Sequence, residues 1–471
     1  MIPQTKKQPE QKMISRRTLL KSVGLGLGAG LGGVSLAQMT NAPIEDQIAH
    51  ATNGVNRASA PSQLQITDMR IATLLGSPMR CPIIRIDTNQ GISGYGEVRD
   101  GASETYALML KARLLRKNPC NVEQIFRLIK QFGYHGRQGG GVSGVEMALW
   151  DLAGKAYGVP VYQLLGGKYR DTVRVYADTP QGRGVEGLKS RQTQGFTWLK
   201  MDLGIGAVSN NPEAITRPSG RGLPGTPHPF TGIQLSDKGA ALMAERLAQA
   251  REAVGMQIPI SLDHFGSIGV KSCIKLAKAL SPYNPAWLED MVPWQYTDLL
   301  KEIRDAIDVP LLTGEDIYLL DGFKPLIEQH AVDYVQPDLA TAGGILETKK
   351  IGDFAEGHGV AMALHNAGTP VSFMANVHCA AATQNFLVLE NHAADSTFWE
   401  NLVSGLPKPL VNKGFVRVPE APGLGIELNL EEMQRHLDRS QGRGLFLPTP
   451  EWDRERSQDH LFSKNVSPAS A

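Results

Sequence analysis

Five short segments between residues 258 and 365 decide the fold, because each is an apolar run that ends in an acidic or imidazole side chain. They read Ile258-Pro-Ile-Ser-Leu-Asp263, Ala286-Trp-Leu-Glu289, Val309-Pro-Leu-Leu-Thr-Gly-Glu315, Val332-Asp-Tyr-Val-Gln-Pro-Asp338 and Val360-Ala-Met-Ala-Leu-His365. The terminal residues are 26, 26, 23 and 27 positions apart, about the length of one strand, one helix and two loops. This spacing predicts an α/β fold with a parallel (β/α)8 barrel, which holds its functional side chains at such strand ends.

Length and composition agree with a barrel and a second domain. The chain has 471 residues, of which 42% are hydrophobic and 20% charged, and a barrel needs roughly 250 residues. The formal net charge of +1 gives no electrostatic case for binding nucleic acid or a membrane surface. The four cysteines show no CxxC spacing and predict neither a zinc site nor a disulfide framework.

The first residues differ from the rest of the chain. Ser15-Arg-Arg-Thr-Leu-Leu-Lys21 precedes a Gly-rich apolar run, and Ser35-Leu-Ala37 offers small residues before a cleavage point. The pattern predicts a signal peptide of the twin-arginine type over 1–37, followed by a flexible spacer over 38–62. A buried helix is the alternative, but each glycine would cost it about 0.8–1 kcal/mol. We therefore expect an exported or periplasmic protein with no membrane span in its mature form.

A small α+β domain is predicted over residues 63–171, ahead of the barrel. Its β-rich runs precede its helical runs without alternation, which is typical of a separate α+β unit. The strand-like segments are 64–73, 81–88 and 91–97, and the helical segments are 103–115, 122–132 and 143–157.

The barrel is assigned to residues 172–400. Residues 207–237 form an insertion rich in Pro, Gly and Asn, which predicts either an ordered lid over the barrel or a disordered loop. Residues 401–447 are interpreted as a C-terminal return to the small domain, and 448–471 as a mobile tail.

Asp263, Glu289 and Glu315 end three successive predicted strands, so we expect their carboxylates to converge on one point of the barrel rim. Three convergent anions repel one another unless a cation lies among them, and hard oxygen ligands suit Mg²⁺.

Asp338 and His365 end the next two strands. A carboxylate beside an imidazole orients the ring and raises its basicity, which predicts a general base.

The helix and turn that end the small domain resemble a known family. Ser143-Gly-Val-Glu-Met-Ala-Leu-Trp-Asp151 and Gly158-Val-Pro-Val-Tyr-Gln-Leu-Leu-Gly-Gly167 are similar to the segment that joins capping domain and barrel in the mandelate racemase-like branch of the enolase superfamily. The family's Asp-Glu-Glu metal spacing and Asp–His dyad are also present. The resemblance implies an α+β N-terminal capping domain, Mg²⁺ as cofactor, a small-molecule acid as substrate and a homo-oligomer. It further implies that cap loops near 74–80 and 99–104 close over the substrate. Glu146 and Asp151 are expected to be structural.

Enolase-superfamily sites use a Lys or His base with Mg²⁺ stabilising an enediolate, which here implies His365 as the base. Glu390, after Phe386-Leu-Val-Leu, is assigned to the eighth strand, where a carboxyl could hydrogen-bond an enediolate oxygen if its neighbours keep it protonated or share a proton with it. Racemising and lactonising relatives carry Lys-x-Lys on the second strand, whereas this chain has Lys200-Met-Asp202. The missing lysine favours elimination, as in the galactonate and mannonate type of sugar-acid dehydratase, and so predicts a hydro-lyase.

One departure concerns the general acid for the leaving hydroxyl. Those dehydratases have a histidine two residues after the metal aspartate, whereas here His264 follows Asp263 directly. On a regular strand the His264 side chain would face the helices and the Phe265 side chain would face the barrel interior. His264 could still protonate the leaving hydroxyl if the backbone bends at Gly266. Tyr134, His135 or Arg137 could serve as the general acid instead. Two other functions stay open: a racemase or epimerase using Lys200 opposite His365, and an inactive sugar-acid-binding relative.

Overall fold

The computed structural model describes residues 60–76, 79–216, 233–263, 265, 268–440 and 444–455. The predicted signal peptide, His264, Gly266 and the centre of the 207–237 insertion lie outside these residues, so the predictions about them stay predictions. Within the described ranges, none of the helices is both long and apolar enough for a membrane span.

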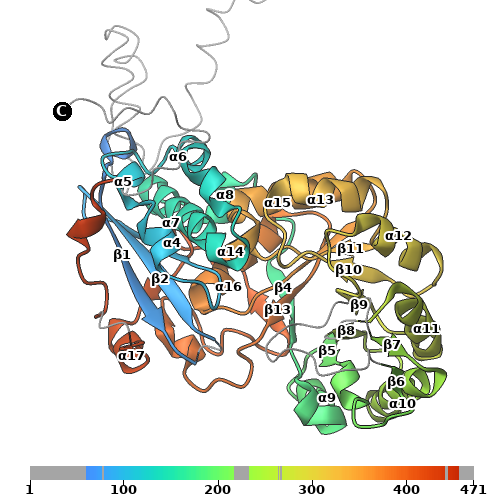
Figure 1. Ribbon diagram of the computed structural model, residues 1–471. Coiled ribbons are helices and arrows are strands. Elements are labelled where there is room, and N and C mark those ends of the chain that lie inside the picture. Colours follow the sequence, from blue (N-terminus) through green and yellow to red (C-terminus); the bar gives the residue numbers. More distant parts are fainter. Residues whose placement is uncertain are drawn as a thin grey trace, which may run out of the picture. The chain divides into compact units, whose positions relative to one another are not determined.

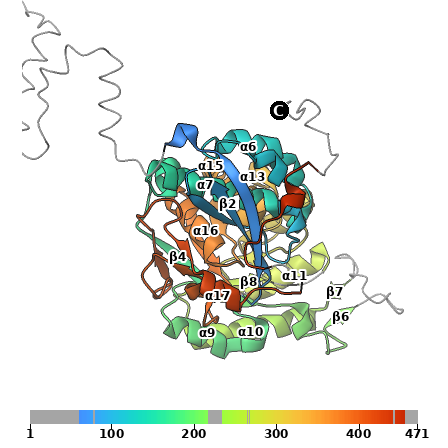
Figure 2. The ribbon, with the colours of Figure 1, turned by 90° about the vertical axis from the view of Figure 1, so that its left-hand side faces the viewer.

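An antiparallel sheet and several helices form the capping domain, at the left of Figure 1 and facing the viewer in Figure 2. The strands pair in the order β1-β2-β3. Their bounds are Ile66–Leu74 (β1), Cys81–Thr88 (β2) and Ser93–Glu97 (β3). The helices are α4 (Thr105–Leu108), α5 (Lys111–Leu114), α6 (Val122–Ile129), α7 (Gly140–Tyr157) and α8 (Val161–Leu164).

The single helix expected over 103–115 is wrong, because the chain forms α4 and α5 with a turn between them. Leu108 and Leu110 are both fully buried. One straight helix would place residues two apart about 200° around its axis and could not bury both against one core. The turn resolves this conflict.

Helix α7 lies against β3, and two strand glycines permit the close approach. A Cβ on Gly96 would lie 1.9 Å from the carbonyl oxygen of Gly144, and one on Gly94 would lie 2.4 Å from that of Ala148. Asp151 of α7 accepts hydrogen bonds from the backbone N–H of Tyr95 (2.9 Å) and of Leu424 (2.8 Å). This carboxylate therefore ties the helix both to its own sheet and to the C-terminal segment.

Eight parallel strands close into a barrel through pairing of the last strand, β13, with the first, β4, so the predicted fold class is confirmed. The strands are β4 (Thr172–Ala177), β5 (Leu199–Asp202), β8 (Ile260–Asp263), β9 (Leu288–Glu289), β10 (Leu311–Thr313), β11 (Tyr334–Val335), β12 (Ala361–Leu364) and β13 (Phe386–Asn391). The surrounding helices are α9 (Gly184–Thr193), α10 (Asp237–Val254), α11 (Val270–Leu280), α12 (Thr297–Asp305), α13 (Leu319–Glu328), α14 (Leu339–Ala342), α15 (Ile345–Glu356) and α16 (Pro370–Ala382).

Aromatic side chains fill the barrel below its rim. The rings of Trp198 and Trp287 lie 5.1 Å apart. Residues two apart on a strand point to the same face, so Trp198 and Trp287 lie directly below Lys200 and Glu289. The indole N–H of Trp287 donates to Glu289 Oε2 at 3.1 Å. The core thereby holds one site carboxylate in place.

Short strands complete the molecule. The described ends of the 207–237 insertion include an antiparallel pair, β6 (Ile215–Thr216) and β7 (Gln234–Leu235). After the barrel, β15 pairs antiparallel with the start of β4, and β14 pairs with β16. The bounds are β14 (Val403–Ser404), β15 (Phe415–Arg417), β16 (Glu427–Leu428) and α17 (Leu430–Arg435). The chain then returns to the cap, where Asp438 Oδ2 accepts from Arg80 Nε at 2.9 Å.

Candidate active site

Lys200 lies inside the barrel rim among three carboxylates. Its Nζ is 2.8 Å from Asp263 Oδ2, 3.0 Å from Glu289 Oε1 and 2.8 Å from Glu390 Oε1. The four residues come from four different strands, and the Lys200 side chain is only 1% exposed. Burial would lower the pKa of Lys200, but the three carboxylates raise it well above its usual range. The ammonium is therefore a fixed charge and not a neutral base.

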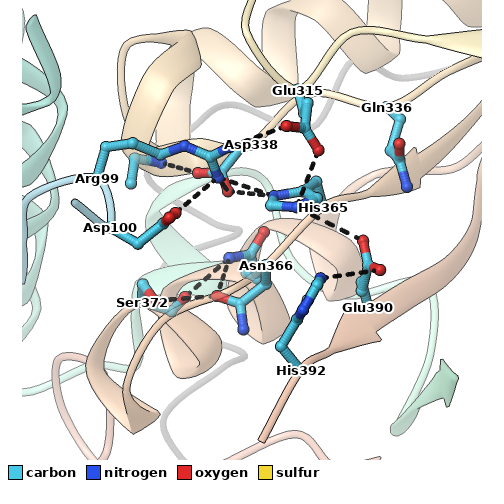
Figure 3. Close-up of polar contacts among 12 residues, drawn as sticks. Arg99, Asp100, Glu315, Gln336, Asp338, His365, Asn366, Ser372, Glu390 and His392 are labelled. Carbon is cyan, nitrogen blue, oxygen red and sulfur yellow. Dashed lines mark hydrogen bonds and ion pairs between the residues drawn. The ribbon is translucent and has the colours of Figure 1, made fainter. Parts of the chain in front are cut away.

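The Asp338–His365 pair forms a second cluster at the neighbouring strand ends (Figure 3). His365 Nδ1 lies 2.6 Å from Asp338 Oδ2, and Asp338 Oδ1 accepts from the backbone N–H of Ala340 at the start of α14. Burial would raise the pKa of Asp338, but Arg99 and His365 outweigh it and lower the pKa. An ionised Asp338 accepts from Nδ1–H, which leaves Nε2 as the nitrogen that can take a proton.

His365 Nε2 faces Glu315, at 3.0 Å from its Oε2. Burial would lower the pKa of His365, but the charge of Glu315 raises the pKa to about 9. In this arrangement the ring is held as an imidazolium by the carboxylate in front of it.

Arg99 reaches the base from the capping domain, and sequence reasoning did not single it out. Its guanidinium, 0% exposed, contacts Asp338, lies 2.9 Å from His365 Nδ1 and donates to Glu315 Oε1 at 3.3 Å. The one sequence feature that could have indicated Arg99 is its position at the start of the cap loop predicted near 99–104.

The three alternative general acids near residue 134 lie at different distances from the Asp338–His365 pair and Glu315. Arg137 is at the site, since its guanidinium donates to Glu315 Oε1 and to Asp100 Oδ2, both at 2.9 Å. Tyr134 is 59% exposed and lines the neighbouring cavity. His135 packs near the ring of Tyr106, at 5.7 Å between centroids.

The role predicted for Glu390 requires a carboxyl that stays protonated or shares a proton, and it stays a prediction. Burial would raise the pKa of Glu390, but Lys200, His392 and His365 hold the pKa well below its usual range. The Glu390 side chain is fully buried on β13, and His392 Nε2 lies 3.1 Å from its Oε1. His392 is a second site residue that sequence reasoning missed.

A cavity of about 1010 Å³ opens beside these clusters. Asp263 and Glu315 line it from the barrel, Arg137 and Tyr134 from the cap, and Phe265 lies in its wall after β8. His264 lies outside the described residues. The cavity therefore borders two of the three predicted metal ligands.

The donor set suits a hard divalent cation, although the three predicted ligands have separate partners. Asp263 and Glu289 pair with Lys200, whereas Glu315 pairs with His365, Arg99 and Arg137. Among the residues that the structure describes, the group with three ligand atoms within 4.8 Å of one another is His365, Glu390 and His392.

Excess negative charge remains around the predicted ligands. Burial, with the charges of Glu315 and Asp263, raises the pKa of Asp290 to about 8. Burial and Asp263 likewise raise the pKa of Glu289 well above its usual range. Buried carboxylates that repel one another in this way offer the hard oxygen donors that Mg²⁺ prefers.

Comparison with known proteins matches both parts of the chain. Residues 185–433 match the family described as enolase C-terminal domain-like, and residues 47–166 match the mandelate racemase / muconate lactonizing enzyme, N-terminal domain. D-xylonate dehydratase of Haloferax volcanii is 32% identical over 416 residues, covering 86% of this chain and 96% of that protein. D-galactonate dehydratase of Verminephrobacter eiseniae is 30% identical over 382 residues, covering 78% and 91%. The solved structure of a mandelate racemase/muconate lactonizing enzyme-like protein from Rubrobacter xylanophilus is 31% identical, with a TM-score of 0.71 over 80% of this chain and 98% of that chain.

Proposed function

The chain belongs to the mandelate racemase-like branch of the enolase superfamily, and from this premise we propose that it is a Mg²⁺-dependent dehydratase of a sugar acid of the aldonate class. The reaction removes the proton α to the carboxylate and the β-hydroxyl, giving a 2-keto-3-deoxy acid. The observation that carries the proposal is the buried Asp338–His365 pair, at 2.6 Å, beside carboxylates that we propose as metal ligands. Relatives named D-xylonate and D-galactonate dehydratase support the hydro-lyase class.

Asp263, Glu289 and Glu315 would hold the Mg²⁺. When bound, the ion supplies Lewis-acid stabilisation of the negative charge that develops on the substrate carboxylate. Were Glu315 engaged as a ligand, His365 Nε2 would lose the carboxylate that favours its imidazolium form, and it could then act as the base. Asp338 accepts a hydrogen bond from the other ring nitrogen, Arg99 holds Asp338 in place, and Lys200 keeps a positive charge below the site.

The epimerase alternative has weaker support from the geometry. An epimerase needs a second acid or base opposite His365. Lys200 is engaged with three carboxylates, and the position two residues later holds Asp202 in place of a lysine. An inactive relative is expected to lack a predicted metal ligand or the base. This chain has all three predicted ligands and both members of the Asp338–His365 pair.

The test is turnover of a panel of sugar acids. The purified protein with MgCl₂ is incubated with D-xylonate, D-galactonate and other aldonates, and 2-keto-3-deoxy products are assayed. Formation of such a product from at least one acid is expected, and no turnover on any of them would sink the dehydratase proposal. The same panel in D₂O distinguishes a dehydratase from an epimerase, because hydrogen exchange at C2 without loss of water indicates epimerisation.

A further inference from the structure

The proposed elimination needs a proton donor for the departing hydroxyl, and the sequence left that role open. Hydroxide is a poor leaving group, so a positioned acid contributes about 10²- to 10⁴-fold to such a step. Lys200 is engaged with three carboxylates, and Phe265 lies in the cavity wall after β8. His392, just beyond β13, is a titratable group that the proposed function does not yet use.

His392 and the base share one carboxylate. His392 Nε2 lies 3.1 Å from Glu390 Oε1, and His365 Nε2 lies 3.8 Å from Glu390 Oε2. The two imidazole rings are 5.5 Å apart between centroids, and Figure 3 shows both directed at Glu390. The Nδ1 of His392 lies 3.6 Å from Asp178 Oδ2. A carboxylate oxygen therefore lies near each nitrogen of the His392 ring.

The Nε2 nitrogen of His392 has an ion-pair partner in Glu390 but no hydrogen bond in good geometry. Across the part of the chain that the structure describes, His392 Nε2 and Glu390 Oε2 are buried atoms that lack a hydrogen-bond partner. The 3.1 Å contact with Glu390 is thus an ion pair outside hydrogen-bond geometry. A buried polar atom without a partner costs about 1–3 kcal/mol and needs an explanation in a folded protein. A bound substrate hydroxyl would supply the missing partner.

We propose that His392 is the general acid of the reaction, a role that rests on the proposed function. His365 Nε2 takes the proton from C2, and the electron pair of the broken C2–H bond becomes the C2=C3 double bond. The C3–O bond breaks, its electron pair goes to oxygen, and the Nε2 proton of His392 completes a water molecule. The enol ketonises by gaining a proton at C3 and losing its hydroxyl proton. The proton on His365 then returns to His392 through solvent.

Leaving-group rescue tests this role. Wild type and His392→Asn are compared on the sugar acid that the wild type dehydrates and on its 3-deoxy-3-fluoro analogue, which loses fluoride without needing a proton. For His392→Asn we expect kcat on the hydroxy acid to fall about 10²- to 10⁴-fold, with C2–H exchange in D₂O retained by NMR. On the fluoro acid kcat should stay within about tenfold of wild type, because only the acid is missing.

Matched variants keep the result decisive. His365→Asn should abolish exchange and both eliminations, whereas His330→Asn, at an exposed position, should change none. His264→Asn tests the other candidate for the general acid. If kcat on the fluoro acid is retained in His264→Asn but not in His392→Asn, the proposal is overturned. Equal losses on both acids in His392→Asn also overturn it, by showing a structural role. His392→Gln replaces the Asn variant if that variant does not fold. A wild type inactive on every acid refutes the proposed function instead.

Discussion

At the scale of single residues, Arg99 is the side chain that joins the capping domain to the base. It comes from the loop after β3 and contacts both members of the Asp338–His365 pair. A guanidinium offers donors in a rigid plane, whereas an ammonium is a compact charge, so lysine cannot replace arginine at such a site.

Arg99→Lys is therefore predicted to keep the charge but lose the geometry. A misplaced base costs about 10²-fold, so we expect kcat on the turned-over sugar acid to fall by that order with a smaller change in KM. Arg85→Lys, in a partly buried pair with Asp87 in the capping sheet, is the control and should leave both constants unchanged. An Arg99→Lys enzyme with wild-type kcat would show that the guanidinium does not position the base.

Lys200 carries the second prediction at this scale. Lys200→Met leaves Asp263, Glu289 and Glu390 without their shared cation, and breaking a buried ion pair costs about 3–5 kcal/mol. Urea unfolding in EDTA should show a loss of this order. MgCl₂ should recover more stability in this variant than in wild type, because the ion neutralises the same carboxylates. Lys301→Met, a partly exposed i,i+4 pair with Asp305, is the control. No loss in EDTA would contradict the cluster's role.

At the scale of elements, helix α16 is packed on all sides, and its His378 must stay neutral. The ring stacks on Tyr162 of α8, whose backbone N–H donates to Nδ1 at 3.3 Å. The ring is fully buried, and the backbone of Leu424 also interacts with it. Burial lowers the pKa of His378 to about 4, against about 6.5 in an unfolded chain.

The sign of the pH effect follows from proton binding. Between pH 6.5 and 4 the unfolded chain binds the proton and the folded chain does not, so acidification removes up to about 3 kcal/mol of stability through this histidine. His378→Asn cannot titrate. The difference in unfolding free energy between wild type and this variant, measured in urea, should therefore shrink from pH 7 to pH 4.5. A difference that is independent of pH would be the contrary result.

At the scale of the whole molecule, export is the prediction that the structure leaves untested, because residues 1–37 lie outside the described ranges. We propose a twin-arginine route from Arg16 and Arg17. Replacing both by lysine should abolish the periplasmic pool, measured by cell fractionation and immunoblotting, because the receptor reads the arginine pair. The wild-type protein must be periplasmic in the same experiment. A double variant that is still exported would refute the route.

Local sequence was sufficient wherever a pattern has a fixed geometric meaning. The 23- to 27-residue interval between strand-end acids predicted the barrel, because one βα unit has a narrow range of lengths. The strand-like segment expected over 91–97 is present as β3, and its Gly96 leaves no room for a Cβ beside α7. Asp338, His365 and Glu390 were named from their strand positions, and Lys200 from its match to the family's Lys-x-Lys pattern.

Only the tertiary structure decided how those groups are charged and what stands beside them. Glu390 is ionised because Lys200, His392 and His365 surround it, which strand position cannot reveal. Arg99 reaches the base from more than 200 residues away in the chain, and His392 meets His365 only where β12 and β13 lie side by side. Sequence patterns determine elements because they depend on near neighbours. A pKa and a catalytic partner depend on burial and on charges brought together by folding, so they are properties of the folded barrel.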